Sequence, residues 1–516
     1  MQLLQIEVSG IQQFIFESNR LREWRGASAL LSRMDHQVLD DVIAGTPVEK
    51  IRSRGGVAVL RVPSDAPDET ADRVEETLAR RYRDEAAGVP VHAARVEGSG
   101  VPVLELMDRL ALKAATERER APVVDGGAAR LGPMVRFCDS CGRRAAEEHR
   151  TLGQTEGELL CRRCFEKGRH GLRVRRGVAD GSILDRFARA LGDRSGWPAP
   201  DAVPGCVPDD LEALAEADPN GKIALIQADG NALGRTIQQI DQLEAYREFS
   251  DGVAGAVETA VFDTLAEHPP RDGTLPWEVV FLGGDDVLLF TTASIALPVA
   301  QELAERVAGE TASLMAPYGR DHLSLGTGIA AADPHVPASV LLELAGDLES
   351  SAKDLAYAQD GDVSTVDYHR ITGEGATTLH HIRDETLRPS RDYRAAGDGA
   401  PSRAPTRLTA RPFTTDQLAS VRAVATAWEE AGLSRSKLHR LREALFESPA
   451  EAIRTWTHVV ARASDDERPA WRRLQSLAPE GESTQKLPWA APSTSAAPDV
   501  RRKTYLLDIL DALALR

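Results

Sequence analysis

The chain has 516 residues, of which 42% are hydrophobic and 27% charged, the balance of a folded globular protein with several domains. Its formal net charge of −17 disfavours tight, unaided, non-specific binding of nucleic acid, because such binding depends on neutralising phosphates. No apolar run reaches the roughly 18–20 residues that span a bilayer, and the N-terminus, MQLLQIEVSG, lacks the pattern of a secretory signal. We therefore expect a cytoplasmic protein without membrane association.

Residues 1–125 are expected to form a first α/β domain. An alternating strand over 3–8 is followed by a segment of helical periodicity over 18–43. Further strands are predicted over 57–62 and 91–96, each followed by an amphipathic helix. Strands separated by helices of this length indicate a compact α/β sandwich.

Residues 126–220 contain a cysteine-bearing insert and a connecting helical segment. Two CxxC pairs stand nineteen residues apart, and their four cysteines are Cys138, Cys141, Cys161 and Cys164. This spacing matches sites in which two thiolate knuckles complete one zinc tetrahedron. Because such a site has no open coordination position, the single Zn²⁺ is expected to be structural. Eleven Lys/Arg against six Asp/Glu over 136–176 make the insert basic, which suits either a docking surface or a solvated rim.

A second α/β domain is expected over 221–384. Its first strand ends in the acidic turn of LIQADGNALG, and two later apolar strands flank the glycines and aspartates of FLGGDDVLLF, residues 281–290. Each segment by itself is compatible with an ordinary turn. Together they bring Asp229, Asp285 and Asp286 to neighbouring strand ends, which favours a site for two catalytic Mg²⁺ or Mn²⁺ ions.

The two α/β regions resemble each other around a pair of glycines. Gly55-Gly56 precede the strand VAVLRVP, as Gly283-Gly284 precede two aspartates and the strand VLLFTT. We interpret this as a duplicated fold in which one copy keeps the acids. Two unrelated Gly-Gly turns are the alternative interpretation.

The remaining sequence divides into a linker and a helical domain. Residues 385–412 have linker composition, and residues 413–516 are expected to be largely helical. Within them, 479–499 are of low complexity, and the amphipathic segment 504–515 is expected to dock on the helical domain. We expect this domain to serve partner docking rather than metal binding.

GGDD between two apolar strands is similar to the palm domain of nucleotide cyclases and CRISPR polymerases. VSGIQQFIFESNRLREWRGASALLS, residues 8–32, resembles the opening of the first palm in the large, polymerase-like subunit of type III CRISPR effector complexes, of the Csm/Cmr large-subunit type. That family joins a degenerate first palm, a four-Cys zinc insert, a GGDD palm and a helical domain, and the same parts follow in that order here. GTGIAAADPHVPASVLLELAGDLESSAKDLA, STVDYHRI and TYLLDILDAL are similar to later segments of the family. The resemblance implies an α/β (α+β) fold with two ferredoxin-like palm domains.

The resemblance also implies an enzyme, a nucleotidyltransferase that makes cyclic oligoadenylate second messengers from ATP in antiviral defence. In that reaction a 3′-hydroxyl attacks the α-phosphate of another ATP and pyrophosphate leaves, giving 3′–5′ linkages. The implied activator is target RNA. The implied partners are guide RNA and target RNA, bound through the other subunits of the complex, including a small subunit and a Cas5-like subunit.

By position in the family's motifs, Asp229, Asp285 and Asp286 would be catalytic and would hold the two metal ions. The implied nucleotide-binding residues are Gly230, Asn231, Gly283 and Gly284, Lys353 of the SSAK segment, and Ser9, Gly10 and Ile11 of the first domain. Among these, the two hairpin glycines would lie along the phosphates and Lys353 would meet the triphosphate. Asn231 would face the nucleotide, and the three residues of the first domain would help to seat a second ATP.

The sequence departs from the family pattern in two places. Many members begin with an HD nuclease domain, whereas this sequence begins at the first palm, and Asp35-His36 reads DH within a predicted helix. No DNase activity is therefore expected. Asn231 stands where an acid is often found. Two alternatives remain: a stand-alone GGDD cyclase making another cyclic nucleotide signal, or a catalytically idle scaffold subunit of a ribonucleoprotein. The scaffold reading predicts loss of the acids, and all three are present.

Overall fold

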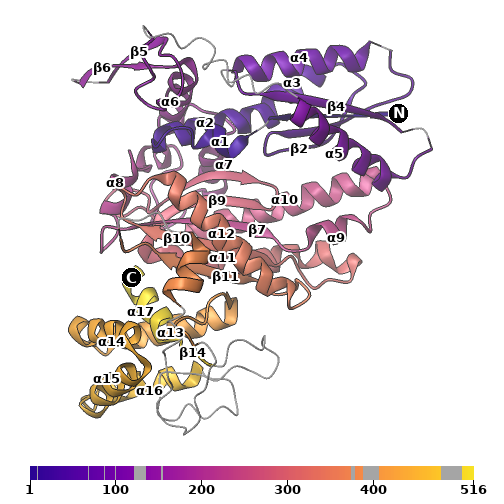
Figure 1. Cartoon of the computed structure of the whole chain (residues 1–516). Helices are drawn as coiled ribbons and strands as arrows, with labels where there is room; N and C mark the ends of the chain where they lie inside the picture. The colour runs from indigo at the N-terminus through magenta and orange to yellow at the C-terminus, as the bar shows by residue number, and fades with distance from the viewer. Residues whose placement is uncertain are drawn as a thin grey trace.

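The computed structural model describes residues 1–8, 10–67, 69–85, 88–98, 100–120, 135–152, 155–373, 378–387, 406–477 and 502–516. Figure 1 shows two sheet-containing domains stacked on each other, with a helical domain at the far side of the second. No described helix combines the length and the apolar character needed to cross a membrane.

The first domain is a four-stranded antiparallel sheet with helices between its strands. The strand order is β2-β3-β1-β4, which is the ferredoxin-like βαββαβ arrangement and confirms the expected fold class. Its elements are β1 (Gln2–Val8), α1 (Ile11–Ile15), α2 (Leu21–Arg33), a π-helix η1 (Met34–Val38), α3 (Leu39–Ile43), β2 (Glu49–Arg54), β3 (Val57–Val62), α4 (Thr70–Glu85), β4 (Val91–Glu97) and α5 (Val103–Arg120).

Strand β2 was not predicted from the sequence. Its residues, EKIRSR, are mostly polar, but they alternate, so that Ile51 and Ser53 are buried while their neighbours are partly exposed. β2 pairs with β3 across a turn in which Gly55 and Gly56 both have positive φ angles, +62° and +74°. Glycine adopts such angles without the steric cost that a side chain would bring. The first glycine pair is therefore a hairpin, like the second.

The insert consists of β5 (Glu148–Leu152), β6 (Thr155–Leu160) and α6 (Arg162–Arg175), followed by α7 (Ile183–Leu191), the 3₁₀ turn η3 (Val203–Cys206) and α8 (Leu211–Glu216). Helix α6 lies directly against α2 of the first domain. A Cβ on Gly26 would overlap the Lys167 carbonyl, and a Cβ on Gly171 would overlap the Arg22 carbonyl. The two helix backbones therefore touch, which only small residues at the crossing allow.

The second domain has a six-stranded sheet of order β13-β11-β10-β7-β9-β8. The four adjacent strands β8-β9-β7-β10 repeat the ferredoxin-like order of the first domain, with β9 and β7 in the middle of the four. The elements are β7 (Ile223–Gly230), α9 (Leu233–Ile237), α10 (Leu243–Ala266), β8 (Trp277–Gly283), β9 (Asp286–Thr292), α11 (Ala293–Met315), η4 (Ala316–Tyr318), β10 (Leu325–Ala332), α12 (Ala338–Tyr357), β11 (Thr365–Arg370) and, after the gap, the π-helix η5 (His381–Thr386).

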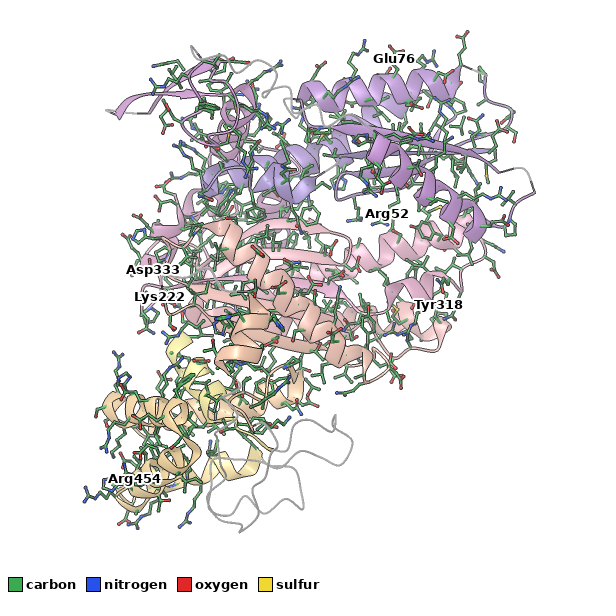
Figure 2. The ribbon with its side chains drawn as sticks, in the orientation of Figure 1. Arg52, Glu76, Lys222, Tyr318, Asp333 and Arg454 are labelled. Atoms are coloured by element: carbon green, nitrogen blue, oxygen red, sulfur yellow. The ribbon has the colours of Figure 1, made fainter. Side chains whose placement is uncertain are left out.

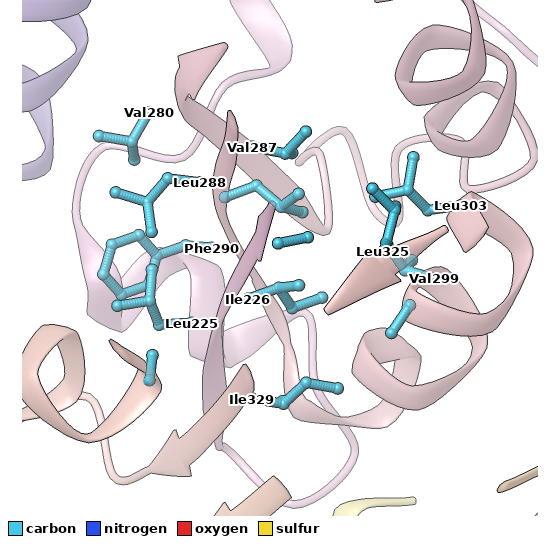
Figure 3. Close-up of a cluster of buried hydrophobic side chains, with 14 of the residues drawn as sticks. Leu225, Ile226, Val280, Val287, Leu288, Phe290, Val299, Leu303, Leu325 and Ile329 are labelled. Carbon is cyan, nitrogen blue, oxygen red and sulfur yellow. The ribbon is translucent and has the colours of Figure 1, made fainter. Parts of the chain in front are cut away.

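Both faces of this sheet are buried. In Figure 3, Leu225 and Phe290 lie on one face, whereas Ile226 lies on the other with Val299 of α11. The first face packs against the first domain, where Trp24 of α2 stacks on Phe290 with ring centroids 5.3 Å apart. Because neighbouring residues of a strand point to opposite faces, the continuous apolar runs of β7 and β9 are those of a sheet covered on both sides.

A buried ion pair joins the two domains at the same place. Arg25 of α2 donates to both carboxylate oxygens of Glu278 on β8, at 2.8 and 2.9 Å. The Arg25 and Glu278 side chains are 4% and 6% exposed. Helix α2 thus contacts the cysteine-bearing insert on one side and, on the other, the strand that leads into the FLGGDDVLLF hairpin.

The C-terminal region is helical, as expected, and it completes the second sheet. It comprises β12 (Thr406–Arg407), β13 (Phe413–Thr414), α13 (Thr415–Glu430), α14 (Arg435–Glu447), α15 (Pro449–Ala461), α16 (Glu467–Arg473), η6 (Leu474–Leu477), β14 (Arg502–Lys503) and α17 (Leu506–Leu515). Strand β13 pairs with β11. Residues 479–499 lie outside the described residues.

The described end of the expected linker is not an exposed connection. Leu408, Thr409 and Arg411 are at most 3% exposed. The Arg411 guanidinium contacts Asp508 at 2.8 Å and Asp511 at 3.0 Å, both on α17, and it lies over the Tyr368 ring. Docking of the last helix was expected on the helical domain. It takes place there, through α13 and α14, and also against β11 of the second domain.

Candidate functional site

The three predicted carboxylates meet at one edge of the second sheet. Asp229 stands near the end of β7, and Asp285 and Asp286 stand at the turn between β8 and β9. Strands β7 and β9 are paired up to Ala228 and Val287. Asp229 and Asp286, the next residue on each strand, are therefore neighbours. A Cβ on Gly230 would lie 2.8 Å from Oδ2 of Asp285. The side chain of Asp285 thus rests on the backbone next to Asp229.

Lys353 of α12 lies within this group. Its ammonium contacts Oδ2 of Asp229 and lies 2.8 Å from Oε1 of Glu349, one helical turn earlier. Glu349 also accepts a hydrogen bond from Gln227 Nε2 at 2.6 Å. A Cβ on Gly326 would be 2.5 Å from Cγ of Lys353, so glycine at this position of β10 leaves room for the lysine stem.

The charges of the site are unevenly balanced. Burial opposes a charge on Asp229, but the Lys353 ammonium outweighs it and lowers the pKa of Asp229. Burial and the neighbouring Asp229 raise the pKa of Asp285 to about 7. Burial, Asp229 and Asp285 raise the pKa of Asp286 to about 8; this residue is exposed, but protein atoms surround its carboxyl group. Excess negative charge of this kind is typical of sites completed by cations.

The donor set suits divalent metal ions. Carboxylate oxygens are the ligands that Mg²⁺ prefers. Of the three carboxylates, only Asp229 forms an ion pair within the described residues, so the negative charges of Asp285 and Asp286 are not neutralised by a salt bridge. Among the described residues, only the four cysteines form a group of three or more whose ligand atoms all lie within 4.8 Å of one another. The three aspartates are not a group of that kind, but the Asp229 side chain lies within hydrogen-bonding reach of Asp285 and of Asp286. Two ions about 3.5–4 Å apart would suit carboxylates arranged in this way.

The predicted nucleotide-binding residues of the second domain differ in exposure. Gly283 ends β8 and pairs with Asp286, and Gly284, with a φ of +81°, begins the two-residue turn between them. Asn231 is fully buried. Its Nδ2 donates to Ser324 Oγ at 3.0 Å, while its Oδ1 is buried without a hydrogen-bond partner. Asn231 thus lies inside the protein and not on the surface beside the three carboxylates.

The glycine hairpin of the first domain touches the acidic hairpin. A Cβ on Gly283 would lie 3.2 Å from Cα of Gly55. Gly10 and Ile11 are near the same turn, since a Cβ on Gly56 would be 3.0 Å from Cδ1 of Ile11. Ser9 lies outside the described residues. The two copies of the fold therefore meet hairpin to hairpin.

Asp35 holds the first hairpin in place, a role that the sequence did not indicate. Its two carboxylate oxygens accept hydrogen bonds from the Gly56 N–H at 3.2 and 3.1 Å. Its backbone carbonyl accepts one from Ser53 Oγ at 2.8 Å. Burial raises the pKa of Asp35 to about 7. Asp35 of the Asp35-His36 dipeptide thus stabilises the Gly55-Gly56 hairpin.

The four cysteines form a compact cluster. Their sulfur atoms lie within 4.8 Å of one another, and the N–H groups of Ser140 and Cys164 point at Cys138 Sγ and Cys161 Sγ, at 3.4 and 3.5 Å. Four thiolates in such knuckles fit a structural Zn²⁺ ion. Cys161 is also the N-cap of α6, so the cluster fixes the start of the helix that packs on α2.

Replacing one cluster cysteine, Cys161→Ser, is expected to lower zinc content and thermal stability together, because folding of such a cluster is coupled to metal binding. Elemental analysis and thermal unfolding would measure both. Cys206→Ser provides the control, since Cys206 lies outside the cluster. A Cys161→Ser protein with full zinc occupancy and unchanged melting would refute the assignment.

Comparisons with known proteins agree with this geometry. Residues 222–360 match the family model described as Cas10/Cmr2, second palm domain. A search of the curated proteins gave no significant match. The Csm1–Csm4 cassette in complex with pppApApA is similar in structure, with a TM-score of 0.54 and 13% identity, covering 100% of this chain and 69% of that chain. The cassette in complex with cA3 gives a TM-score of 0.51 at 13% identity, over 92% and 68%.

Two ferredoxin-like domains that meet hairpin to hairpin, one of them bearing three carboxylates, define a protein of the palm-domain type. Residues 222–360 of the second domain match the Cas10/Cmr2 second palm, and the chain as a whole is similar in fold to a chain of the Csm1–Csm4 cassette. In the match to the apo Csm1–Csm4 cassette, the chain spans 53% of the other chain's length, at 16% identity and a TM-score of 0.44. We refer to the two domains below as the first and second palm.

Proposed function

We propose that the chain is a nucleotidyltransferase that makes cyclic oligoadenylates from ATP as the large subunit of a type III CRISPR effector complex. The observation that carries the proposal is the meeting of Asp229, Asp285 and Asp286 at one hairpin of a Cas10/Cmr2-type palm. The similar cassette structures hold, by their descriptions, pppApApA, cA3 and AMPPNP. Ligands made of adenylate units favour ATP as the substrate of this chain.

In this proposal, each part of the site has a separate task. Asp229, Asp285 and Asp286 hold two divalent ions, which supply charge neutralisation and alignment of the reacting oxygens when bound. Gly283 and Gly284 leave the hairpin backbone open to phosphate oxygens. Lys353 meets the triphosphate as a point charge.

The chemical step transfers an adenylyl group. The 3′-hydroxyl oxygen of one adenosine forms a bond to the α-phosphorus of a second ATP, and the bond from that phosphorus to the bridging oxygen breaks. Pyrophosphate leaves with the electron pair, and the hydroxyl proton passes to solvent. Repetition followed by closure on the first adenylate gives a ring. Positioning and charge stabilisation account for most of the acceleration in this kind of reaction.

Gly10, Ile11 and Ser9 of the first palm are proposed to seat the second ATP. Gly10 and Ile11 flank the Gly55-Gly56 hairpin, which touches the catalytic one. The helical domain is proposed to dock the other subunits, through which guide RNA and target RNA act on the site. The cassette descriptions name Csm4 as a partner of the similar chains.

Incubation with each labelled nucleoside triphosphate tests substrate and activation together. The protein is mixed with Mg²⁺ or Mn²⁺, alone and as a complex with guide RNA, with and without target RNA, and products are separated by chromatography. Oligoadenylates from ATP that increase with target RNA would support the proposal. Target-independent formation of a different cyclic nucleotide would favour a stand-alone cyclase, and absence of product from every nucleotide would favour a scaffold subunit.

A further inference from the structure

Arg52 of the first palm lies directly opposite the catalytic hairpin. It belongs to β2, which leads into the Gly55-Gly56 turn, and its side chain is half-buried. Its Nη2 atom lies 4.0 Å from the position that a Cβ on Gly284 would take. Figure 2 shows Arg52 in the opening between the two palms, on the side that faces the second.

Arg52 has no ion-pair partner among the described residues. Two other arginines of this domain are engaged: Arg61 with Glu49 and Glu244, and Arg95 with Asp72 and Glu75. A partly buried guanidinium has lost some of its hydration and gains from an anionic partner. Its position therefore suits a ligand rather than a structural contact.

The charges of the hairpin indicate what that ligand would be. Arg52 is close enough to the hairpin for its charge to attract the Asp285 carboxylate. Lys353 of the second palm is already held by Asp229 and Glu349. Arg52, which has no ion pair within the described part of the chain, is thus placed to neutralise charge on the open side of Gly284.

The glycine at position 284 leaves space for a ligand between the hairpin turn and the Arg52 guanidinium. Without a Cβ, the surface of the turn is open to a phosphate group, which could then approach within the 2.7–2.9 Å of a charge-assisted hydrogen bond from Arg52. Guanidinium groups donate two parallel hydrogen bonds to phosphate oxygens. A nucleotide base offers no comparable acceptor pair with negative charge.

We propose that Arg52 binds the β- and γ-phosphates of the nucleotide held at the Gly283–Asp286 hairpin, so that the degenerate palm completes the triphosphate site of the active one. The inference rests on the proposed function, since it assumes a nucleoside triphosphate at that hairpin. It also gives the first palm a part in the reaction that does not depend on carboxylates. Because the β- and γ-phosphates leave as pyrophosphate, Arg52 would contact the charged oxygens of the leaving group.

Binding of 3′-deoxy-ATP, which lacks the attacking hydroxyl, separates this inference from catalysis. For Arg52→Gln in the full chain with Mg²⁺, we expect the Kd for 3′-deoxy-ATP to rise roughly tenfold to a hundredfold, the loss typical of a hydrogen bond to a charged group. Binding of adenosine, which has no phosphates, should be unchanged. Arg52→Lys should fall between wild type and Arg52→Gln, because it keeps the charge but loses the paired donors.

Lys50→Gln is the matched control. Lys50 precedes Arg52 by two residues on the same strand, and its ammonium pairs with the exposed Asp40 at 2.6 Å. It should bind 3′-deoxy-ATP like wild type, and the melting temperatures of all variants should agree within about 2 °C. Equal Kd values for Arg52→Gln and wild type, or equal loss of 3′-deoxy-ATP and adenosine binding, would overturn the inference.

The outcomes also distinguish this inference from the proposed function. If wild type binds 3′-deoxy-ATP and Arg52→Gln binds it weakly, the Arg52 inference holds even if no oligoadenylate is formed from ATP. If wild type makes oligoadenylates and Arg52→Gln has the same KM for ATP, the proposed function stands and the Arg52 inference fails.

Discussion

Replacing both hairpin acids, Asp285→Asn/Asp286→Asn, is expected to abolish oligoadenylate formation while the protein stays folded. The substitution keeps the shape of each side chain and removes the negative charge that holds divalent ions. Loss of several kcal/mol of charge stabilisation corresponds to a rate reduction on the order of 10³-fold or more. Product formation from ATP under single-turnover conditions would measure it. A variant that retains a tenth of the wild-type rate would contradict the site assignment.

The same variant should change how stability depends on pH. The folded-state pKa values of Asp285 and Asp286 are raised to about 7 and about 8, above the roughly 4 of an unfolded aspartate. The folded state therefore binds more protons than the unfolded state between these values, and wild-type stability falls as the pH rises through them. The double variant lacks both groups and should lose less stability over this interval.

Melting curves from pH 5 to pH 9, in chelator and then in Mg²⁺, would test this stability prediction. In chelator, the melting temperature of wild type should decline relative to that of the double variant. Mg²⁺ should raise the melting temperature of wild type and leave the variant unchanged, because a ligand stabilises only the state that binds it. Parallel pH profiles, or equal stabilisation of both proteins by Mg²⁺, would count against a metal site at the hairpin.

The second large effect is expected at the base of the helical domain, where Arg411→Ala should strongly destabilise the protein. The Arg411 and Asp508 side chains are fully buried, and Asp511 is 4% exposed. Arg411 Nη1 also donates to the Tyr368 carbonyl at 2.6 Å. Removing the arginine leaves two buried carboxylates without their main cation, a change that typically costs about 3–5 kcal/mol.

Chemical denaturation would measure this loss, with Arg454→Ala as the control. Arg454 forms an exposed ion pair with Glu451 within one helix, and exposed pairs of this kind contribute little to stability. Its removal should leave the unfolding midpoint unchanged. If Arg411→Ala were no more destabilising than Arg454→Ala, the buried network would not be what joins α17 to the second palm.

The acidic hairpin was predictable because its signals are local. The sequence shows two apolar strands around Gly283–Asp286 and an acid at the end of the strand over 223–230. In the structure, the pairing of these strands places Asp229 beside the hairpin. The four-cysteine cluster was predictable for the same reason, since two CxxC turns supply all four sulfur atoms. In both cases the key residues stand in short turns whose pattern can be recognised in the sequence.

Features that depend on distant partners could not be predicted in this way. The segment around Arg411 has the composition of a linker, and it is buried because Asp508 and Asp511, about a hundred residues later, neutralise the arginine. Strand β2 is polar and becomes a strand by pairing with β3. Asn231 lies on the first-strand motif but is turned into the protein toward Ser324. The approach of Arg52 to Gly284 exists only once the two palms are stacked.

The central claim is that the three carboxylates of the second palm join ATP molecules into rings. Mass spectrometry of the products formed from ATP by wild type and by Asp285→Asn/Asp286→Asn, each assembled with guide and target RNA, tests it most directly. The account predicts masses of whole multiples of adenylate without a terminal triphosphate from wild type, and none from the double variant. The same products from both proteins would contradict it.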